Sequence, residues 1–282
     1  MSETMQKIKV IYVFGSGHSG STLASLMLGR HSRIESVGEI KAYEHAIEEK
    51  ALCNCGTPLL ECSYWKGIHQ RLGSDAATGF PALNAEDATE FARENTRFLN
   101  ALLENAGKDF FCDSSKTKWR LFKYLASPEF EVTVLHVVRD GRAVAYSNFM
   151  KDRSYWSHLL RWRKRNVREL RRFFENGLSR DRYYRIRYED LVADPESTLG
   201  QFQKELGLSF EADQLANWAL GNHHVSGNPM AKKSNQEIRV DRRYLENLSR
   251  FAWFSGSLLI GPELKRYGYP RSRRRSGAML KE

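Results

Sequence analysis

The stretch IKVIYVFGSGHSGST, residues 8–22, decides the expected fold of this chain. It opens with a short apolar run, continues through glycines at positions 15, 17 and 20, and ends where Ser21 begins a helical pattern. Glycine lets the backbone turn tightly and bring its N–H groups close to an anion, and a helix that follows points its positive end at the same place. The segment therefore predicts a strand, a phosphate-binding loop and a helix.

One residue typical of nucleoside-triphosphate loops is missing. The pattern G-x-x-x-x-G-K-[ST] places a lysine on the β- and γ-phosphates and a hydroxyl on magnesium. Residues 15–22 read GSGHSGST, so Ser21 stands at the lysine position. We therefore expect the loop to hold a phosphate, but not ATP·Mg in the usual way.

The rest of the chain alternates between strand and helix patterns. Further strands are expected at residues 110–113, 132–138 and 183–187, and helices at 21–28, 141–150, 195–206 and 210–220. The run VTVLHVV (132–138) is apolar and rich in β-branched residues, as in a parallel strand covered on both faces. This alternation predicts a single α/β domain with a P-loop-type doubly wound, mainly parallel sheet flanked by helices. The domain spans residues 1–270, with loop insertions at 41–83 and 222–241, followed by a basic tail at 271–282.

Length and charge narrow the classes of protein. A chain of 282 residues can bury a full core, and no apolar run approaches the roughly 20 residues that cross a bilayer. Residues 8–14 are too short for a signal-peptide core, so we expect a cytoplasmic protein. The net charge of +10 favours an anionic partner, such as a nucleotide, an anionic substrate, a membrane surface or a nucleic acid. The arginines of the tail are expected to be solvated, or to contact a lipid surface or the substrate transiently.

Three of the four cysteines lie together in CNCGTPLLEC, residues 53–62. The C-x-C spacing with a third cysteine seven residues later lacks the paired C-x₂-C of common zinc sites, and no histidine is adjacent, although His45 or His69 could fold in. Reduced thiols, a disulfide and a metal site all stay open. A cytosolic setting disfavours the disulfide, and we expect reduced thiols and no bound metal.

The ends of the expected strands carry the residues suited to chemistry. In parallel sheets, ligands bind at the carboxyl ends of the strands. The glycine loop, DSSK (113–116), RDGR (139–142) and YED (188–190) each follow one strand. Three of these segments would bring hydrogen-bond donors or cations to one crevice.

Together these segments resemble the sulfotransferases that use 3′-phosphoadenosine-5′-phosphosulfate (PAPS). GSGHSGSTL (15–23) resembles the family's 5′-phosphosulfate loop, and VVRDGRAVAYSN (137–148) resembles its 3′-phosphate motif. RYEDLVADPESTL (187–199) and LLIGPELKRYGY (258–269) resemble segments of bacterial and carbohydrate-type members. The resemblance implies PAPS as co-substrate and no metal. The residues expected to bind PAPS are Ser16, Gly17, His18, Ser19, Gly20, Ser21, Thr22, Arg139, Ser147, Gly227 and Asn228.

The same resemblance implies roles in catalysis for three residues. Lys116 matches a lysine that stabilises the transferring group. His18 stands where members commonly carry Lys or Arg, and we expect it to be protonated by the bound anion and to donate to the leaving oxygen. Glu39 matches a glutamate that serves as the general base for the acceptor hydroxyl. His136, His223 and His224 are alternative bases, of which His136 lies inside an expected strand.

The predicted reaction is transfer of a sulfuryl group from PAPS to a hydroxyl or amine of a carbohydrate, glycolipid or small metabolite. Two other classes compete with it. A phosphate-loop kinase is disfavoured by Ser21, although Asp113 ends a strand where a magnesium ligand would stand. A non-catalytic protein binding RNA or phosphoinositides is supported by the basic helix RWRKRNVRELRR (161–172), whose cationic face we expect to be solvated. No nucleic-acid partner is expected.

Overall fold

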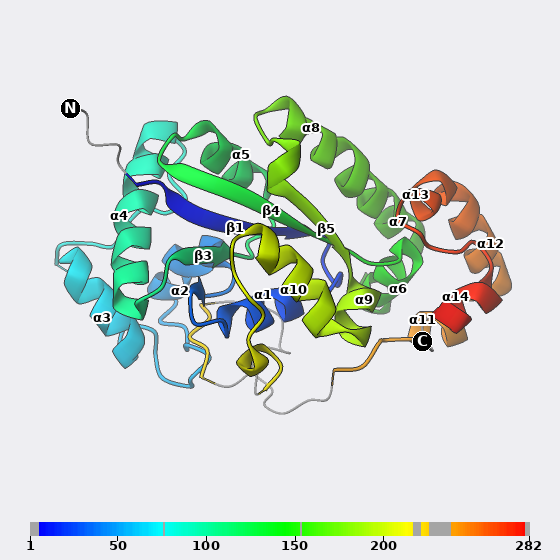
Figure 1. Ribbon diagram of the computed structural model, residues 1–282, viewed down its shortest axis with the longest axis horizontal. Coiled ribbons are helices and arrows are strands. Elements are labelled where there is room, and N and C mark those ends of the chain that lie inside the picture. The colour runs from blue at the N-terminus through cyan, green and yellow to red at the C-terminus, as the bar shows by residue number, and fades with distance from the viewer. Residues whose placement is uncertain (1–5, 76, 153, 217–220, 226–237, 280–282) are drawn as a thin grey trace.

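The computed structural model describes residues 6–75, 77–152, 154–216, 221–225 and 238–279 (Figure 1). Gly227 and Asn228, expected to contact the nucleotide, lie outside the described residues. So does most of the expected insertion at 222–241.

The core of the fold is one five-stranded parallel sheet. Its strands are β1 (Ile8–Gly15), β2 (Ile34–Ser36), β3 (Phe110–Asp113), β4 (Phe130–Val138) and β5 (Tyr183–Arg187). They lie side by side in the order β2-β3-β1-β4-β5, so the strand that leads into the glycine loop is central. All four pairings are parallel, which brings the carboxyl ends of all five strands to one edge. The predicted fold class is confirmed, and β2 is a strand that the sequence interpretation missed.

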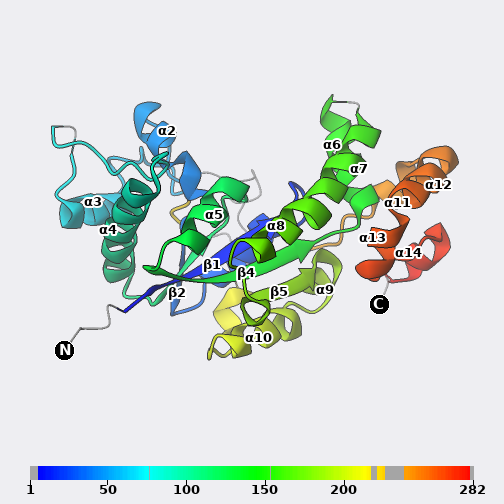
Figure 2. The same cartoon turned by 90° about the horizontal axis from the view of Figure 1, so that it is seen from above.

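Alternation along β1 divides the core into two layers. Val10, Tyr12 and Phe14 face one side of the sheet, and Ile11 and Val13 face the other. The first side is covered by α2 (Tyr43–Glu48), α3 (Ser63–Leu72), α4 (Ala88–Ala106), α5 (Lys118–Ala126) and α8 (Leu170–Glu175). The second is covered by α1 (Ser21–Gly29), α9 (Tyr188–Ala193) and α10 (Pro195–Glu205). Figure 2 shows α4, α5 and α8 on one side of the sheet and α9 and α10 on the other.

A third apolar cluster lies beyond the carboxyl end of β4. It is built from α6 (Gly141–Asp152), α7 (Tyr155–Lys164), α11 (Arg243–Asn247), α12 (Arg250–Leu259) and α13 (Gly261–Arg266). Figure 1 shows the C-terminal helices gathered at this end of the molecule. No helix among the described residues combines the length and the apolar character needed to cross a membrane.

The segment expected to be a solvated tail is instead partly folded. Residues Arg273–Met279 form α14, whose Ser276 is buried. Arg142, fully buried in a 2.6 Å ion pair with Asp140, donates to the carbonyl of Arg271 and to Ser276 Oγ, both at 3.3 Å. Arg273 donates to the carbonyls of Leu245 and Leu248. A buried arginine therefore ties this segment to the start of α6, while Arg274 and Arg275 stay exposed.

Two further expectations need correction. The helix expected at 210–220 is, in its described part, a single 3₁₀ turn, η4 (Ala212–Gln214). Glu211, the N-cap residue of this turn, accepts from the backbone N–H of Ser32 at 2.7 Å. The basic helix at 161–172 is interrupted by a π-helical turn, η2 (Arg165–Glu169), between α7 and α8. The remaining short turns are η1 (Ile40–Ala42) and η3 (Arg180–Arg182).

Candidate functional site

The glycine loop between β1 and α1 has the local geometry that its sequence predicts. Gly20 caps α1 in the left-handed region at φ 89°, and a Cβ there would lie 2.4 Å from the ring of Tyr188. At Gly15 a Cβ would lie 2.6 Å from the Val137 carbonyl oxygen on the neighbouring strand. A Cβ at the exposed Gly17 would meet no atom of the described residues within 4 Å, apart from its neighbours in the chain. The backbone is thus tightly packed at Gly15 and Gly20, and space remains beside Gly17, where a ligand could approach the backbone.

Two serine hydroxyls in this loop are buried without hydrogen-bond partners among the described residues and could donate to an anion. Ser16 and Ser19 are buried, at 7% and 1% exposure, and neither Oγ atom has a hydrogen-bond partner among the described residues. Leaving a buried hydroxyl unpaired costs about 1–3 kcal/mol, so an unpaired pair in one loop indicates a ligand. Ser21 is buried and Thr22 half-buried in the first turn of α1, where helix N–H groups lack partners. These residues fit a phosphate or sulfate group.

Cations surround His18, the residue in the middle of the loop. Its backbone adopts the left-handed region at φ 65°, which is uncommon outside glycine. Burial, together with the positive charges of Lys151, Arg139 and Lys116, lowers the pKa of His18 to about 4. The ligand-free His18 is therefore neutral at pH 7, and the protonated form expected from the sequence requires an anion to offset the neighbouring charges.

Glu39 and Lys116 meet directly at the carboxyl edge of the sheet. Lys116 Nζ lies 2.7 Å from Glu39 Oε1, and Lys41 Nζ lies 3.0 Å from Glu39 Oε2. Burial by itself would raise the pKa of Glu39, but the two lysines outweigh it and hold the pKa below the ordinary 4.5. The carboxylate is therefore ionised at neutral pH, as a general base must be, and it also holds the lysine in place.

This meeting depends on β2, which the sequence interpretation missed. The residues after β2 and those after β3 run beside each other, with Ser114 N–H donating to the Gly38 carbonyl at 3.3 Å and Lys41 N–H donating to Ser115 Oγ at 3.1 Å. Lys116 itself has a left-handed backbone at φ 60°. Two strand ends that are distant in sequence thus place the glutamate and the lysine together.

Arg139 reaches the loop from the end of β4. Its Nη1 donates to the His18 carbonyl at 3.0 Å, and its Nη2 lies 3.2 Å from a carboxylate oxygen of Asp241. Its guanidinium also lies over the ring of Tyr188, 4.7 Å from the ring centroid. Hydrogen bonds from Arg243 and Arg139 hold the pKa of Asp241 well below its ordinary range, although its burial acts in the opposite direction. An incoming phosphate at Arg139 therefore competes with a carboxylate that already binds it.

The other residues of the RDGR and DSSK segments have structural roles. Arg142 turns away from the crevice to its buried pair with Asp140. Asp113, the one carboxylate that might have held magnesium, is fully buried and bound by Arg120 Nε at 2.7 Å and by the Ser115 N–H at 2.8 Å. Ser147 lies half-buried on α6, its side chain makes no hydrogen bond to another described residue, and its assignment to the 3′-phosphate stays a prediction.

The histidines weighed as alternative bases lie in other surroundings. His136 is fully buried, with its ring nitrogens 2.7 Å from Tyr183 Oη and 2.8 Å from Asn166 Oδ1. His224 is buried beside Ser36, at 3.5 Å. His223 faces the sulfurs of Cys53 and Cys62.

Two residues near the site were given no role by the sequence interpretation, although Glu189 belongs to the YED segment at a strand end. Arg165, counted among the solvated arginines of 161–172, is half-buried in the π-turn and donates to the carbonyl of Lys116. Single π-turns inside helices are frequent at functional sites. Glu189, fully buried after β5, accepts from Tyr269 Oη at 2.7 Å and from the Asp140 N–H at 3.3 Å. Burial raises the pKa of Glu189 to about 7, and its bonds position the segment that carries Arg139.

The fold and the site together define an α/β protein whose central strand leads into an anion-binding loop at the carboxyl edge of a parallel sheet. Comparison with known families is consistent with this definition. Residues 11–212 match the model of the Sulfotransferase family, and the chain belongs to that family. A search of the curated proteins found no matching sequence.

Solved structures of similar fold include the sulfotransferase domain from the curacin biosynthetic pathway, with a TM-score of 0.61 and 21% identity over 94% of this chain and 100% of that one. The sulfotransferase domain of the Synechococcus PCC 7002 olefin synthase gives a TM-score of 0.59 and 19% identity, covering 95% and 97% of the two chains. Sulfotransferase STF9 from Mycobacterium avium gives 0.52 and 12%, covering 94% and 78%. At these identities the likeness concerns the fold.

Proposed function

We propose that this protein transfers the sulfuryl group of PAPS to a hydroxyl or amine of a carbohydrate, glycolipid or small-metabolite acceptor, and releases 3′-phosphoadenosine-5′-phosphate. The observation that carries the proposal is the loop with two buried, unpartnered serine hydroxyls, Ser16 and Ser19, at a place where cations converge on His18. The loop has no lysine for a γ-phosphate, and membership of the sulfotransferase family supports a sulfuryl donor in place of ATP.

In this proposal the loop amides and the hydroxyls of Ser16 and Ser19 bind the 5′-phosphosulfate, and Arg139 with Ser147 binds the 3′-phosphate. PAPS supplies a sulfuryl group on a good leaving oxygen. The acceptor oxygen forms a bond to sulfur as the bond from sulfur to the phosphate oxygen breaks, and negative charge grows on that oxygen. Preorganised donors aimed at such growing charge give the largest share of catalysis in many enzymes. Lys116 and protonated His18 have this role here.

Glu39 acts as the general base and removes the proton from the hydroxyl or amine of the acceptor substrate. The ion pair of 2.7 Å between Glu39 and Lys116 restrains both groups before the donor binds. When an anion draws Lys116 toward itself, the carboxylate loses its main stabilising partner, and its basicity rises. The same interaction therefore couples donor binding to activation of the base.

A comparison of ligands tests the donor assignment. Thermal unfolding is measured with 3′-phosphoadenosine-5′-phosphate and, separately, with ATP·Mg. A ligand at a hundredfold excess over its Kd stabilises by about 2.7 kcal/mol, a rise in Tm on the order of 5–10 °C for a chain of this size. We expect the rise with the 3′-phosphorylated nucleotide, and we expect Arg139→Ala to lose most of it. Arg182→Ala, which removes a 2.7 Å ion pair with Glu131 near the start of β5, serves as the matched control. Stabilisation by ATP·Mg alone would refute the donor assignment.

A glutamate variant tests the base. Glu39→Gln is expected to lower kcat by about 10²–10⁴-fold, the usual range for a general base, and to leave nucleotide binding in place. Glu263→Gln is the matched control, because Glu263 is also largely buried and paired with an arginine, Arg163 at 2.8 Å. If Glu39→Gln and the control variant had the same kcat, Glu39 would not be the general base, and its role would be limited to its ion pairs with the lysines.

A further inference from the structure

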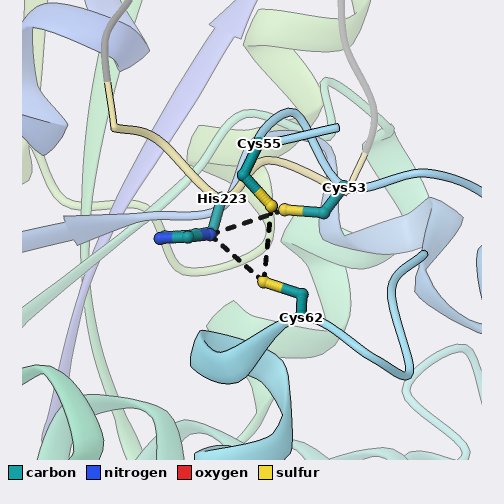
Figure 3. A group of neighbouring side chains, drawn as sticks. All are labelled: Cys53, Cys55, Cys62 and His223. Atoms are coloured by element: carbon teal, nitrogen blue, oxygen red, sulfur yellow. Dashed lines mark hydrogen bonds between the residues drawn. The ribbon is translucent and has the colours of Figure 1, made fainter. Parts of the chain in front are cut away.

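A cluster of four metal-binding side chains lies outside the crevice just described. Cys53, Cys55 and Cys62 belong to the loop before α3, and His223 belongs to a segment about 160 residues later in the chain. Figure 3 shows the three sulfurs and the imidazole of His223 pointing toward one another. The sequence suggested His45 or His69 as a fourth ligand, but His69 instead lies 2.9 Å from Tyr43 Oη.

The spacing of the four ligand atoms matches a tetrahedral metal centre. His223 Nδ1 lies 3.5 Å from Cys53 Sγ and 3.4 Å from Cys62 Sγ, and Cys55 Sγ lies 3.6 Å from Cys62 Sγ. All four atoms lie within 4.8 Å of one another. With bonds of about 2.3 Å to sulfur and about 2.0 Å to nitrogen, a tetrahedral zinc ion needs ligand atoms about 3.5–3.8 Å apart.

The surrounding structure holds the ligands in this arrangement. Gly56, at φ 89°, permits the tight turn in which its N–H donates to the Cys53 carbonyl at 2.9 Å. The ring of Tyr64 stacks on His223 with centroids 4.5 Å apart and planes 2° from parallel, which fixes the imidazole with Nδ1 toward the sulfurs. Cys53 and Cys62 are 2% exposed. Such support around the ligands is typical of metal sites and reduces the cost of ordering them.

We propose that Cys53, Cys55, Cys62 and His223 bind one structural zinc ion. Three cysteines and one histidine form a closed four-ligand set of the kind that selects zinc, without an open position for catalysis. On binding, the three thiol protons leave to solvent, and the loaded centre carries one net negative charge. A disulfide between Cys55 and Cys62 would leave unexplained why His223 Nδ1 approaches both Cys53 and Cys62.

The zinc would join two segments that the sequence assigned to the acceptor side. One is the insertion that contains the cysteines. The other continues from His223 to Val225, whose N–H donates to the carbonyl of Val37 at 2.9 Å, two residues before Glu39. The metal therefore fixes the wall beside the strand end that carries Glu39, and it also fixes the start of the chain that leads to residues 226–237. This proposal does not depend on the identity of the sulfuryl donor.

The full chain, expressed with zinc in the medium and purified without chelator, tests the proposal by elemental analysis. We expect one zinc ion per chain after dialysis, and we expect Cys62→Ala and His223→Ala to lose it. Cys112→Ala removes the fourth cysteine, which is buried in β3 outside the cluster, and should keep the metal. His223→Cys should also keep it, as a site of four cysteines. Zinc that persists in Cys62→Ala would overturn the assignment.

A second measurement covers variants that fail to fold. Cobalt(II) replaces zinc in the wild-type chain, and tetrahedral thiolate ligation gives an intense charge-transfer band together with visible ligand-field bands. Alkylation of Cys53, Cys55 and Cys62 should be suppressed by zinc and restored by a chelator, while Cys112 is unaffected. Absence of zinc and of the cobalt bands overturns the proposal, as does a mass two hydrogens lower, which marks a disulfide.

Discussion

Nucleotide binding should be linked to proton uptake at His18. In the ligand-free protein, burial and the charges of Lys151, Arg139 and Lys116 lower the pKa of His18 to about 4. At pH 7 roughly one molecule in a thousand is therefore protonated at this position. A polyanion in the loop offsets the same positive charges, so the pKa of His18 rises when the nucleotide binds.

The size of the effect follows from the pKa reached in the complex. A return to the ordinary value of 6.5 gives an uptake of about 0.25 proton per nucleotide at pH 7, and a value one unit higher gives about 0.75. Because the bound form is the protonated one, affinity is highest at low pH and falls as the pH rises through the pKa of the complex. Between the pKa of the free protein, about 4, and the pKa of the complex, the contribution of His18 weakens affinity by up to about tenfold per pH unit, and above the pKa of the complex this dependence levels off.

Isothermal titration calorimetry with 3′-phosphoadenosine-5′-phosphate in two buffers of different ionisation enthalpy measures the uptake. The nucleotide's own phosphates titrate equally with every variant, so the difference between wild type and His18→Asn isolates the histidine. His45→Asn, which changes an exposed histidine on α2, is the matched control and should behave as wild type. Equal proton uptake by wild type and His18→Asn would refute the assignment of His18 as a cation in the complex.

Two further predictions concern the loop and the core. Gly20→Ala places a Cβ 2.4 Å from the Tyr188 ring at φ 89° and should lower the free energy of unfolding, measured with urea, by about 1–3 kcal/mol. Gly17→Ala should keep the stability of the wild type and lose nucleotide binding. Equal losses of stability in the two variants would contradict this view of the loop. Burial lowers the pKa of His136 to about 3, so the stability that its neutral form provides is complete above pH 6.5 and should fall by up to about 1.4 kcal/mol per pH unit as the pH drops below that value. Unfolding at pH 7.5 and pH 5.5 measures the slope, which should flatten in His136→Gln.

The sequence predicted those parts of the fold that leave a local signal. Apolar runs placed β1, β3 and β4 within two residues, because buried parallel strands read as continuous hydrophobic segments. The edge strand β5, YYRIR, was also placed at its observed bounds, although it is not apolar throughout. Strand β2 escaped because it is three residues long and two of them, Glu35 and Ser36, are polar. The pairing of β2 with β3 sets the position of the residues that follow each strand, so the contact between Glu39 and Lys116 was not predictable from sequence spacing alone. The same holds for His223, since nothing local links it to cysteines about 160 residues earlier.

The described site keeps two of its cations, Lys116 and Arg139, paired with carboxylates before any anion arrives. Lys116 is bound by Glu39, Arg139 is bound by Asp241, and His18 is uncharged. This arrangement lowers the repulsion among neighbouring positive groups in a partly buried place, where an unpaired charge is costly. An anion that binds at this place must therefore replace the carboxylates as the partner of Lys116 and Arg139, and each replacement breaks one of the existing ion pairs. If an anion takes Lys116 as proposed, Glu39 becomes a stronger base. In the proposed reaction, donor binding and activation of the acceptor would share one set of charges, and the two roles proposed for Glu39, as ion-pair partner and as base, would not conflict.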